Sequence, residues 1–256
     1  MLYLSYTIVK LLSTSYMKLF SIFLEVANIQ PLRIIATLAD GRVAGNDPWF
    51  PLDALLAASW LKINVPELIG TPITDFNNVI EADLPLKKLG DGDDWYWACS
   101  FNRGVKLGEY IKYYHKRFDD QLEQYLTPHA KKIDVQRGKF KAGRIPLTVM
   151  LFDRLIWYAV GDADAIRTLC SRVTHIGKKP SQGFGVVAEW QVEPWPEDWS
   201  IIDSAGNLTR AIPTAQPGTP PSGRIEHCPI RPPYWLVTRR RLCYIPEVTN
   251  ASDMVP

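Results

Sequence analysis

The segment that most constrains the fold is a helix, a glycine-rich loop and a strand in succession, between Asp162 and Glu193. Asp162 is a typical N-cap, and in DADAIRTLCSRVTHI apolar side chains recur every three or four positions, as on one helix face. Gly177 stands where such a helix ends. After the loop GKKPSQGFG (177–185), the run AEWQVE alternates apolar and polar residues, which predicts a half-buried strand.

The spacing of the glycines excludes two kinds of nucleotide-binding loop. A Walker loop requires G-x4-G-K-[ST], whereas five residues separate Gly177 from Gly183 and a phenylalanine follows. The run GFGVVA matches G-x-G-x-x-A, but a dinucleotide fingerprint follows a strand and opens a helix, the reverse of the order here. The loop therefore connects a helix to a strand without belonging to either class.

Two interpretations of this loop remain. In the first, another chain approaches the backbone at Gly177, Gly183 and Gly185, because these residues have no side chains. Its RNA contacts would be three polar partners for phosphates or bases and one stacking ring, namely Lys178, Lys179, Gln182 and Phe184. In the second, the loop is a basic surface turn that needs glycine for positive φ. The residues alone favour neither.

Local patterns predict the other elements. These are strands at 32–39, 79–89, 95–101 and within 145–160, and helices at 52–62 and 107–126. The second helix is expected because Leu107, Ile111, Tyr114, Phe118, Leu122 and Tyr125 follow steps of three and four. The resulting order predicts an α+β fold, a ferredoxin-like (RRM-like) βαββαβ unit with insertions.

Charge gives no argument for nucleic acid over the whole chain, because its net charge is only +2, but one local cluster is basic. The run KKIDVQRGKFKAGR (131–144) carries six basic residues and one acid, and its glycines suggest an exposed hairpin arm. Its candidate RNA contacts are Lys131, Lys132, Arg137, Lys139, Lys141 and Arg144. The alternative is a solvated charge run, which a lone cluster more often is.

Residues 31–194 are expected to form one domain, with a proline-rich segment, 195–256, packing on it. Residues 1–30 are apolar, but Lys10, Lys18 and Glu25 interrupt them, so we expect an extension or a mis-assigned start rather than a membrane span. The four cysteines form no C-x-x-C pair, which predicts no zinc site. Scattered thiols suit a reducing cytosol, so we expect a cytoplasmic protein without a metal or cofactor.

Four pieces of the chain, taken in order, resemble one family. The loop fits G-x-x-x-S-x-G-[FY]-G, a pattern of the RAMP superfamily of CRISPR proteins, and PWFPLDALLAASW (48–60) is similar to the segment after their first strand. With GKFKAGRIPL (138–147) and RPPYW (231–235), the chain resembles the Cas-five-like subunit of type IV CRISPR effector complexes over roughly 31–245.

This resemblance implies a non-catalytic RAMP subunit that binds RNA. Such a subunit holds the 5′ repeat-derived handle of a crRNA, contacts backbone and large subunits, and meets target DNA indirectly. Two alternatives stay open: a scaffold that contacts protein only, and a metal-independent endoribonuclease that processes repeat RNA. In the second, His115, His129 or His175 would carry the proton, although each also has a structural explanation. Arg239, Arg240 and Arg241 fit a solvated edge strand better than an RNA contact.

Overall fold

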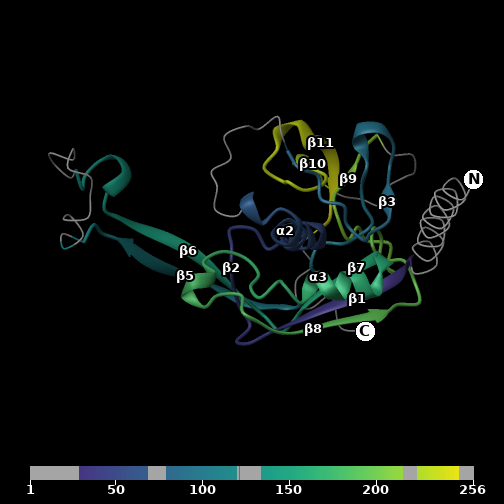
Figure 1. Ribbon diagram of the computed structural model, residues 1–256, viewed down its shortest axis with the longest axis horizontal. Coiled ribbons are helices and arrows are strands. Elements are labelled where there is room, and N and C mark those ends of the chain that lie inside the picture. Colours follow the sequence, from purple (N-terminus) through teal and green to yellow (C-terminus); the bar gives the residue numbers. More distant parts are fainter. Residues whose placement is uncertain (1–28, 69–78, 120, 122–133, 216–223, 248–256) are drawn as a thin grey trace, which may run out of the picture.

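The computed structural model describes residues 29–68, 79–119, 121, 134–215 and 224–247. Its central sheet is antiparallel, in the order β7-β1-β8, with bounds β1 Ile29–Leu38, β7 Leu155–Asp162 and β8 Val187–Pro194. Helices α2 (Leu52–Asn64) and α3 (Ala163–Cys170) pack on one face of it (Figure 1). Their apolar residues share one core cluster with Ile34 of β1 and Trp157 of β7. The expected α+β class is confirmed.

The order of these elements follows local sequence signals. The Asp162 side chain accepts hydrogen bonds from the backbone N–H groups of Asp164 (2.9 Å) and Ala165 (3.0 Å), so the expected N-cap of α3 is confirmed. Helix α3 ends at Cys170, earlier than expected, and a turn at residues 171–172 and an isolated bridge between His175 and Val186 precede or flank the start of the loop at Gly177. No helix in the described part of the chain is long and apolar enough to cross a membrane.

The edge of β7 that faces away from β1 is hydrogen-bonded to an irregular segment rather than to a full strand. The β7 backbone exchanges hydrogen bonds with Lys87, Ala98 and Ser100, at 2.8 to 2.9 Å. Within this segment, β3 (Lys88–Leu89) and β4 (Tyr96–Trp97) form a short hairpin, much shorter than the two strands expected at 79–89 and 95–101. The ferredoxin-like description therefore stays a prediction.

A second sheet, ordered β2-β6-β5, overturns the expected helix at 107–126. Strand β5 (Lys106–Lys116) pairs along its length with β6 (Gly143–Phe152), and β2 (Arg42–Ala44) pairs with the end of β6. The tyrosines of β5 favour a strand, and pairing with β6 outweighs the helical spacing. Residue 120 and residues 122–126 of the expected helix lie outside the described residues. We call β5 and β6 the arm, which projects from the rest of the described molecule (Figure 1).

The third sheet is built from the C-terminal part of the chain. Its order is β10-β11-β9, with bounds β9 Ile212–Pro213, β10 Arg224–Pro229 and β11 Arg240–Ile245. A second core cluster joins this sheet to Tyr96 and Phe101, so the described C-terminal residues pack on the earlier part of the chain. Where a domain boundary falls stays a prediction. Short 3-10 helices occupy Pro66–Leu68, Gly92–Asp94, Gly138–Phe140, Pro180–Gln182 and Val237–Arg239.

Candidate nucleic-acid interface

The glycine-rich loop is fastened to strand β2 by its own backbone. The N–H of Lys178 donates to the carbonyl of Ala44, and the N–H of Gly185 donates to the carbonyl of Arg42, both at 2.7 Å. A third bond, from the N–H of Ile176 to the carbonyl of Gly185 (2.8 Å), closes the loop on itself. The loop therefore sits at the root of the arm, where β2 pairs with β6.

The three glycines have different roles. A Cβ atom on Gly185 would lie 1.8 Å from the carbonyl oxygen of Ile176, and one on Gly177 would lie 2.5 Å from that of Ala44. Both also have positive φ, so glycine is required there by contacts within the chain. Gly183 also has positive φ (+76°), but a Cβ would meet nothing within 4 Å. A close approach by another chain is thus left open at Gly183.

The expectation of an exposed stacking ring at Phe184 is wrong. The side chain is fully buried, in a small core cluster with Ala44, Leu147 and Val149. The physical reason is that the loop must cover the apolar root of the arm, and Phe184 fills that space. Two cations border its ring, with the Lys112 Nζ 5.0 Å and the Arg42 guanidinium 5.5 Å from the ring centre.

Lys179 adopts a backbone conformation that is uncommon for its residue type. It has φ +60° and ψ +49°, in the left-handed region, directly before the 3-10 turn at Pro180–Gln182. Its Nζ lies 4.5 Å from the centre of the Tyr114 ring on β5. Lys178 and Gln182 are exposed beside it. The loop and the arm, distant in sequence, therefore present polar side chains together.

Because β5 is a strand paired with β6 rather than part of the expected helix, a further cation, Lys112, joins the candidate site. Lys112 lies opposite Leu147, and Tyr114 lies opposite Ile145. Because side chains alternate along a strand, Lys112 and Tyr114 share the sheet face that the loop covers. We call Lys112, Tyr114, Lys178, Lys179 and Gln182 the loop-side face. The alternation of tyrosine and lysine at 110, 112 and 114 is the sequence signal that could have placed Lys112 here.

The candidate contacts of the basic run 131–144 are not gathered on this face. Arg144 lies on the opposite face of the arm, with its guanidinium 3.7 Å from the centre of the Tyr113 ring. Arg137 and Lys141 are exposed and precede Gly143, the first residue of β6. Lys131, Lys132 and the side chain of Lys139 lie outside the described residues. The structure thus brings Lys179 of the loop to Tyr114 of the arm, with Lys178 and Gln182 exposed in the same loop, whereas Arg144 lies on the opposite face.

Among the described residues, the cations of the loop-side face have no acidic partner, in contrast to their neighbour Arg42. The Arg42 Nε donates to Asp40 (2.8 Å), and this hydrogen bond lowers the pKa of the Asp40 carboxyl. Within the described residues, no carboxylate forms an ion pair with Lys112, Lys178 or Lys179. Three unneutralised ammonium groups on one face form a surface suited to phosphates.

The central sheet offers no comparable surface. On β8, Glu189 and Gln191 are exposed, and Arg33 of β1 is paired with Glu193. Phosphates would be repelled by the exposed carboxylate of Glu189, which forms no ion pair with any described residue.

The candidate proton carriers of the endoribonuclease alternative lie apart from one another in sequence and environment. His115 is exposed on β5, and the Nδ1 of His175 lies 3.0 Å from the hydroxyl oxygen of Thr174. His129 lies outside the described residues. Among the residues that the structure describes, no three His, Cys, Asp or Glu side chains are close enough together to hold a metal ion.

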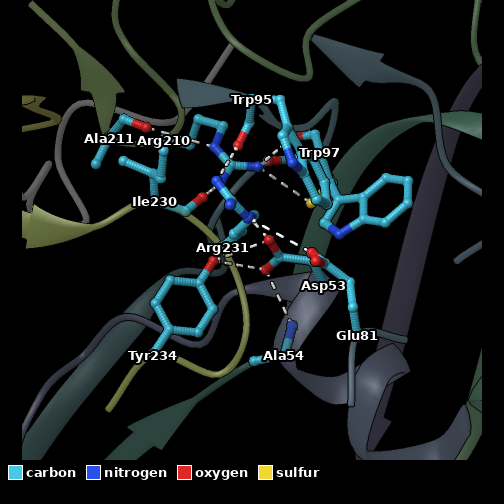
Figure 2. Close-up of polar contacts among 11 residues, drawn as sticks. Asp53, Ala54, Glu81, Trp95, Trp97, Arg210, Ala211, Ile230, Arg231 and Tyr234 are labelled. Atoms are coloured by element: carbon cyan, nitrogen blue, oxygen red, sulfur yellow. Dashed lines mark hydrogen bonds and ion pairs between the residues drawn. The ribbon is translucent and has the colours of Figure 1, made fainter. Parts of the chain in front are cut away.

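Three arginines of the C-terminal region, Arg210, Arg231 and Arg239, are buried, whereas Arg224 and Arg240 are exposed. Arg210 is buried and donates to the carbonyl groups of Trp97, Cys99 (3.0 Å) and Ile230 (2.8 Å) (Figure 2). Its Nη2 lies 3.6 Å from a carboxylate oxygen of Asp53, which also accepts from the Tyr234 hydroxyl (2.7 Å to Oδ1). Burial raises the pKa of Asp53, because loss of solvent outweighs the attraction of the guanidinium.

The tail arginines form structural contacts too. Arg239 is buried, and Arg241 pairs with Asp94. All four cysteines are free thiols, and burial raises the pKa of Cys170 to about 12.

Comparison with known families gives one match. A family model described as CRISPR type IV associated protein Csf3 matches residues 30–246, which is most of the chain. Among curated proteins, none matches. The matched range contains the glycine-rich loop, the arm and the C-terminal sheet.

Proposed function

Because this chain belongs to the Csf3 family of type IV CRISPR-associated proteins, we propose that it is a crRNA-binding subunit of a type IV CRISPR ribonucleoprotein. In this proposal the subunit holds the 5′ repeat-derived handle of the crRNA and carries out no chemistry. It contacts the backbone and large subunits of the complex, and it meets target DNA only through the RNA. It needs no cofactor, and its free thiols suit the cytoplasm.

One observation carries the proposal: the glycine-rich loop packs on the arm so that Lys179 lies over Tyr114 and Lys112 lies over Phe184, with Lys178 exposed next to Lys179 in the same loop. A single-stranded RNA that follows this face would meet three ammonium groups, each able to neutralise one phosphate. Gln182 can donate or accept a hydrogen bond to a base edge. The open space at Gly183 allows the RNA backbone to approach that residue closely.

The same proposal includes the finer description of the fold. We assign the central sheet to a ferredoxin-like RAMP domain, in which the irregular segment 85–103 occupies the place of the second strand. The hydrogen bonds of Lys87, Ala98 and Ser100 to β7 support this assignment. The loop then lies between the second helix and the last strand of that unit, as the family resemblance implies.

The test is RNA binding by the variant Lys112→Ala/Lys178→Ala/Lys179→Ala, measured across about 50 to 200 mM salt. If all three contact phosphates of a repeat RNA, the slope of log K against log salt should shrink by about 2, because each contact contributes roughly 0.7. The matched control is Lys62→Ala/Arg154→Ala/Arg224→Ala, which removes the same charge from exposed sites elsewhere.

A triple variant that keeps the wild-type slope would contradict the proposal, provided that the control behaves as wild type. The non-catalytic part has its own test. The purified protein is incubated with repeat RNA in the absence of divalent metal, and the RNA is expected to stay intact. Cleavage at a defined position, abolished by His115→Ala or His175→Ala, would replace this part of the proposal by the endoribonuclease.

A further inference from the structure

Two buried arginines near the third sheet share a single carboxylate. Arg231 and Arg239 are 8% and 7% exposed, and each has a nitrogen atom 3.5 Å from an oxygen of Glu81. Figure 2 shows Glu81 beside Arg231, next to the fully paired Arg210. Two positive charges thus face one negative charge in a region largely removed from water.

The hydrogen-bonding groups of these two arginines are incompletely used. Among the described residues, the Nε of Arg231 and the Nη1 of Arg239 are buried and have no hydrogen-bond partner. A guanidinium cannot escape this situation by losing its proton, since its pKa is too high. Burial and the charge of Arg239 lower the pKa of Arg231, as expected where two cations lie close together away from water. Among the described residues, the two guanidinium groups therefore have less negative charge and fewer acceptor atoms around them than they can use.

The position of Arg231 is nevertheless fixed. Its Nη1 donates to the carbonyl groups of Asp93 (2.8 Å) and Trp95 (2.9 Å), and its guanidinium lies 4.4 Å from the centre of the Trp95 ring. These contacts leave the Nε edge directed toward Glu81. Arg241, the next cation along, is already paired with Asp94. The unused donors are therefore held in place before any ligand arrives.

Glu81 holds its position between the arginines only loosely. Its side chain is 43% exposed, and its 3.5 Å contacts are longer than the roughly 2.7 to 2.9 Å of a charge-assisted hydrogen bond. A carboxylate that is half in solvent can turn outward at small cost. Its departure would open the arginines to an anion from the solvent side.

We propose that Arg231 and Arg239 form a binding site for a phosphate group, and that the Glu81 carboxylate occupies this site when no phosphate is bound. A phosphate has more acceptor oxygens than a carboxylate and can carry a second charge, so it can satisfy Arg231 Nε together with both terminal nitrogens of Arg239. This site goes beyond the proposed function, because it lies outside the loop-side face. The phosphate group comes from free phosphate or from a nucleic acid.

The test is calorimetric titration of the full chain with inorganic phosphate, at constant ionic strength maintained with chloride. In wild type, Glu81 competes with the ligand. We expect Glu81→Gln to bind phosphate about tenfold more tightly than wild type, the ratio that one lost competing contact gives. The double variant Glu81→Gln/Arg239→Gln is expected to lose this gain.

The matched control is Glu226→Gln, which removes an exposed carboxylate from its ion pair with Arg224 and changes the net charge equally. Equal phosphate affinity in Glu81→Gln and Glu226→Gln would overturn the proposal. If Glu81→Gln does not fold, Glu81→Asp keeps the charge but shortens the reach to the arginines. It should also bind phosphate more tightly than wild type, and no gain there would overturn the proposal equally.

A second titration identifies the source of the phosphate. Glu81→Gln is first saturated with single-stranded oligouridylate, and inorganic phosphate is then added. Loss of the phosphate signal means that RNA phosphates fill the site, whereas an unchanged signal means that free phosphate is the ligand. Both results require the phosphate site. Failure of the loop-side variants to change RNA binding would leave this result untouched.

Discussion

The loop-side face and the C-terminal region both combine cations with aromatic rings, yet they use the cations in opposite ways. Arg210 is buried, and carbonyl groups and Asp53 surround its guanidinium. Lys178 is exposed, and Lys112 and Lys179 lie over rings without a carboxylate partner among the described residues. The partners of a cation, rather than its presence in the sequence, separate a structural group from a binding group.

The two regions also use different cations, arginine around Asp53 and lysine on the loop-side face. A guanidinium has five donors in a fixed plane, so it can join several carbonyl groups inside a protein, as Arg210 does. An ammonium group is compact and strongly hydrated, which suits an exposed face that must release counterions when RNA binds. We therefore expect substitutions around Arg210 to reduce stability, and substitutions on the arm and loop to reduce RNA affinity.

The largest expected effect is that of Asp53→Ala, which leaves Arg210 buried without its counter-charge. We expect the free energy of unfolding to fall by about 3 to 5 kcal/mol, the usual cost of breaking a buried pair on one side. Urea denaturation measures it. The control Asp153→Ala breaks the exposed pair with Arg154 and should cost less than about 1 kcal/mol. A loss in Asp53→Ala no larger than in the control would end the distinction between the regions.

The next largest effect concerns Gly185, which lies on the binding side but is required by contacts within the chain. Gly185→Val should lower the free energy of unfolding by at least about 2 to 3 kcal/mol, because the side chain meets the Ile176 carbonyl and the backbone is strained. Gly183→Asn tolerates positive φ and projects into open space, so it should keep its stability and bind RNA more weakly. Equal melting temperatures for the two variants would contradict these roles.

A smaller effect is expected at the far end of the arm, in Arg137→Ala/Lys141→Ala/Arg144→Ala. If RNA reaches this end, affinity at low salt should fall by about tenfold and the salt slope should shrink by about 2. Stability should change by less than about 0.5 kcal/mol, because the three side chains are exposed. Filter binding and thermal melting of one sample measure both. An unchanged slope would mark this end as a solvated charge run and confine binding to the loop-side face.

The smallest effect is a difference in thiol reactivity between Cys228 of the third sheet and Cys170 of helix α3. Hydrogen bonding with Cys243 lowers the pKa of Cys228, which is only half-buried, whereas burial raises that of Cys170 to about 12. At about pH 8, roughly one in ten thousand Cys170 thiols is ionised. Iodoacetamide should therefore modify Cys228 first in the folded protein, as mass spectrometry of peptides would show. Early modification of Cys170 would mean that the helical layer opens more readily than the third sheet.

Local patterns were sufficient to predict part of the fold. The strand expected at 32–39 and the helix at 52–62 match β1 and α2 closely, and the cap at Asp162 is confirmed. Each of these depends on short-range signals, namely apolar periodicity and capping. The helix expected at 107–126 is wrong over β5, because that strand depends on β6, which begins 27 residues after β5 ends, at Gly143 against Lys116.

The sequence predicted only part of the candidate site, because some of its residues are brought together by contacts between distant segments. Lys178, Lys179 and Gln182 follow from the loop pattern, but Lys112 could be placed only once β5 was known to be a strand. Phe184 stands between glycines, which suggests exposure, and its burial depends on Leu147 and Val149 of a distant strand. Sequence patterns show which residue types are present, whereas the partners of each side chain depend on contacts between distant segments.

Strand β6 has two environments along its length. Met150 and Phe152 lie in the main core, whereas the end that begins at Gly143 is exposed. Gain or loss of one residue between Ile145 and Met150 would exchange its two faces and turn Leu147 and Val149 away from Phe184. Insertions and deletions among members of the family should therefore fall between Lys116 and Gly143. There, evolution can lengthen the arm by about 3.3 Å per residue in each strand while the loop-side face stays intact.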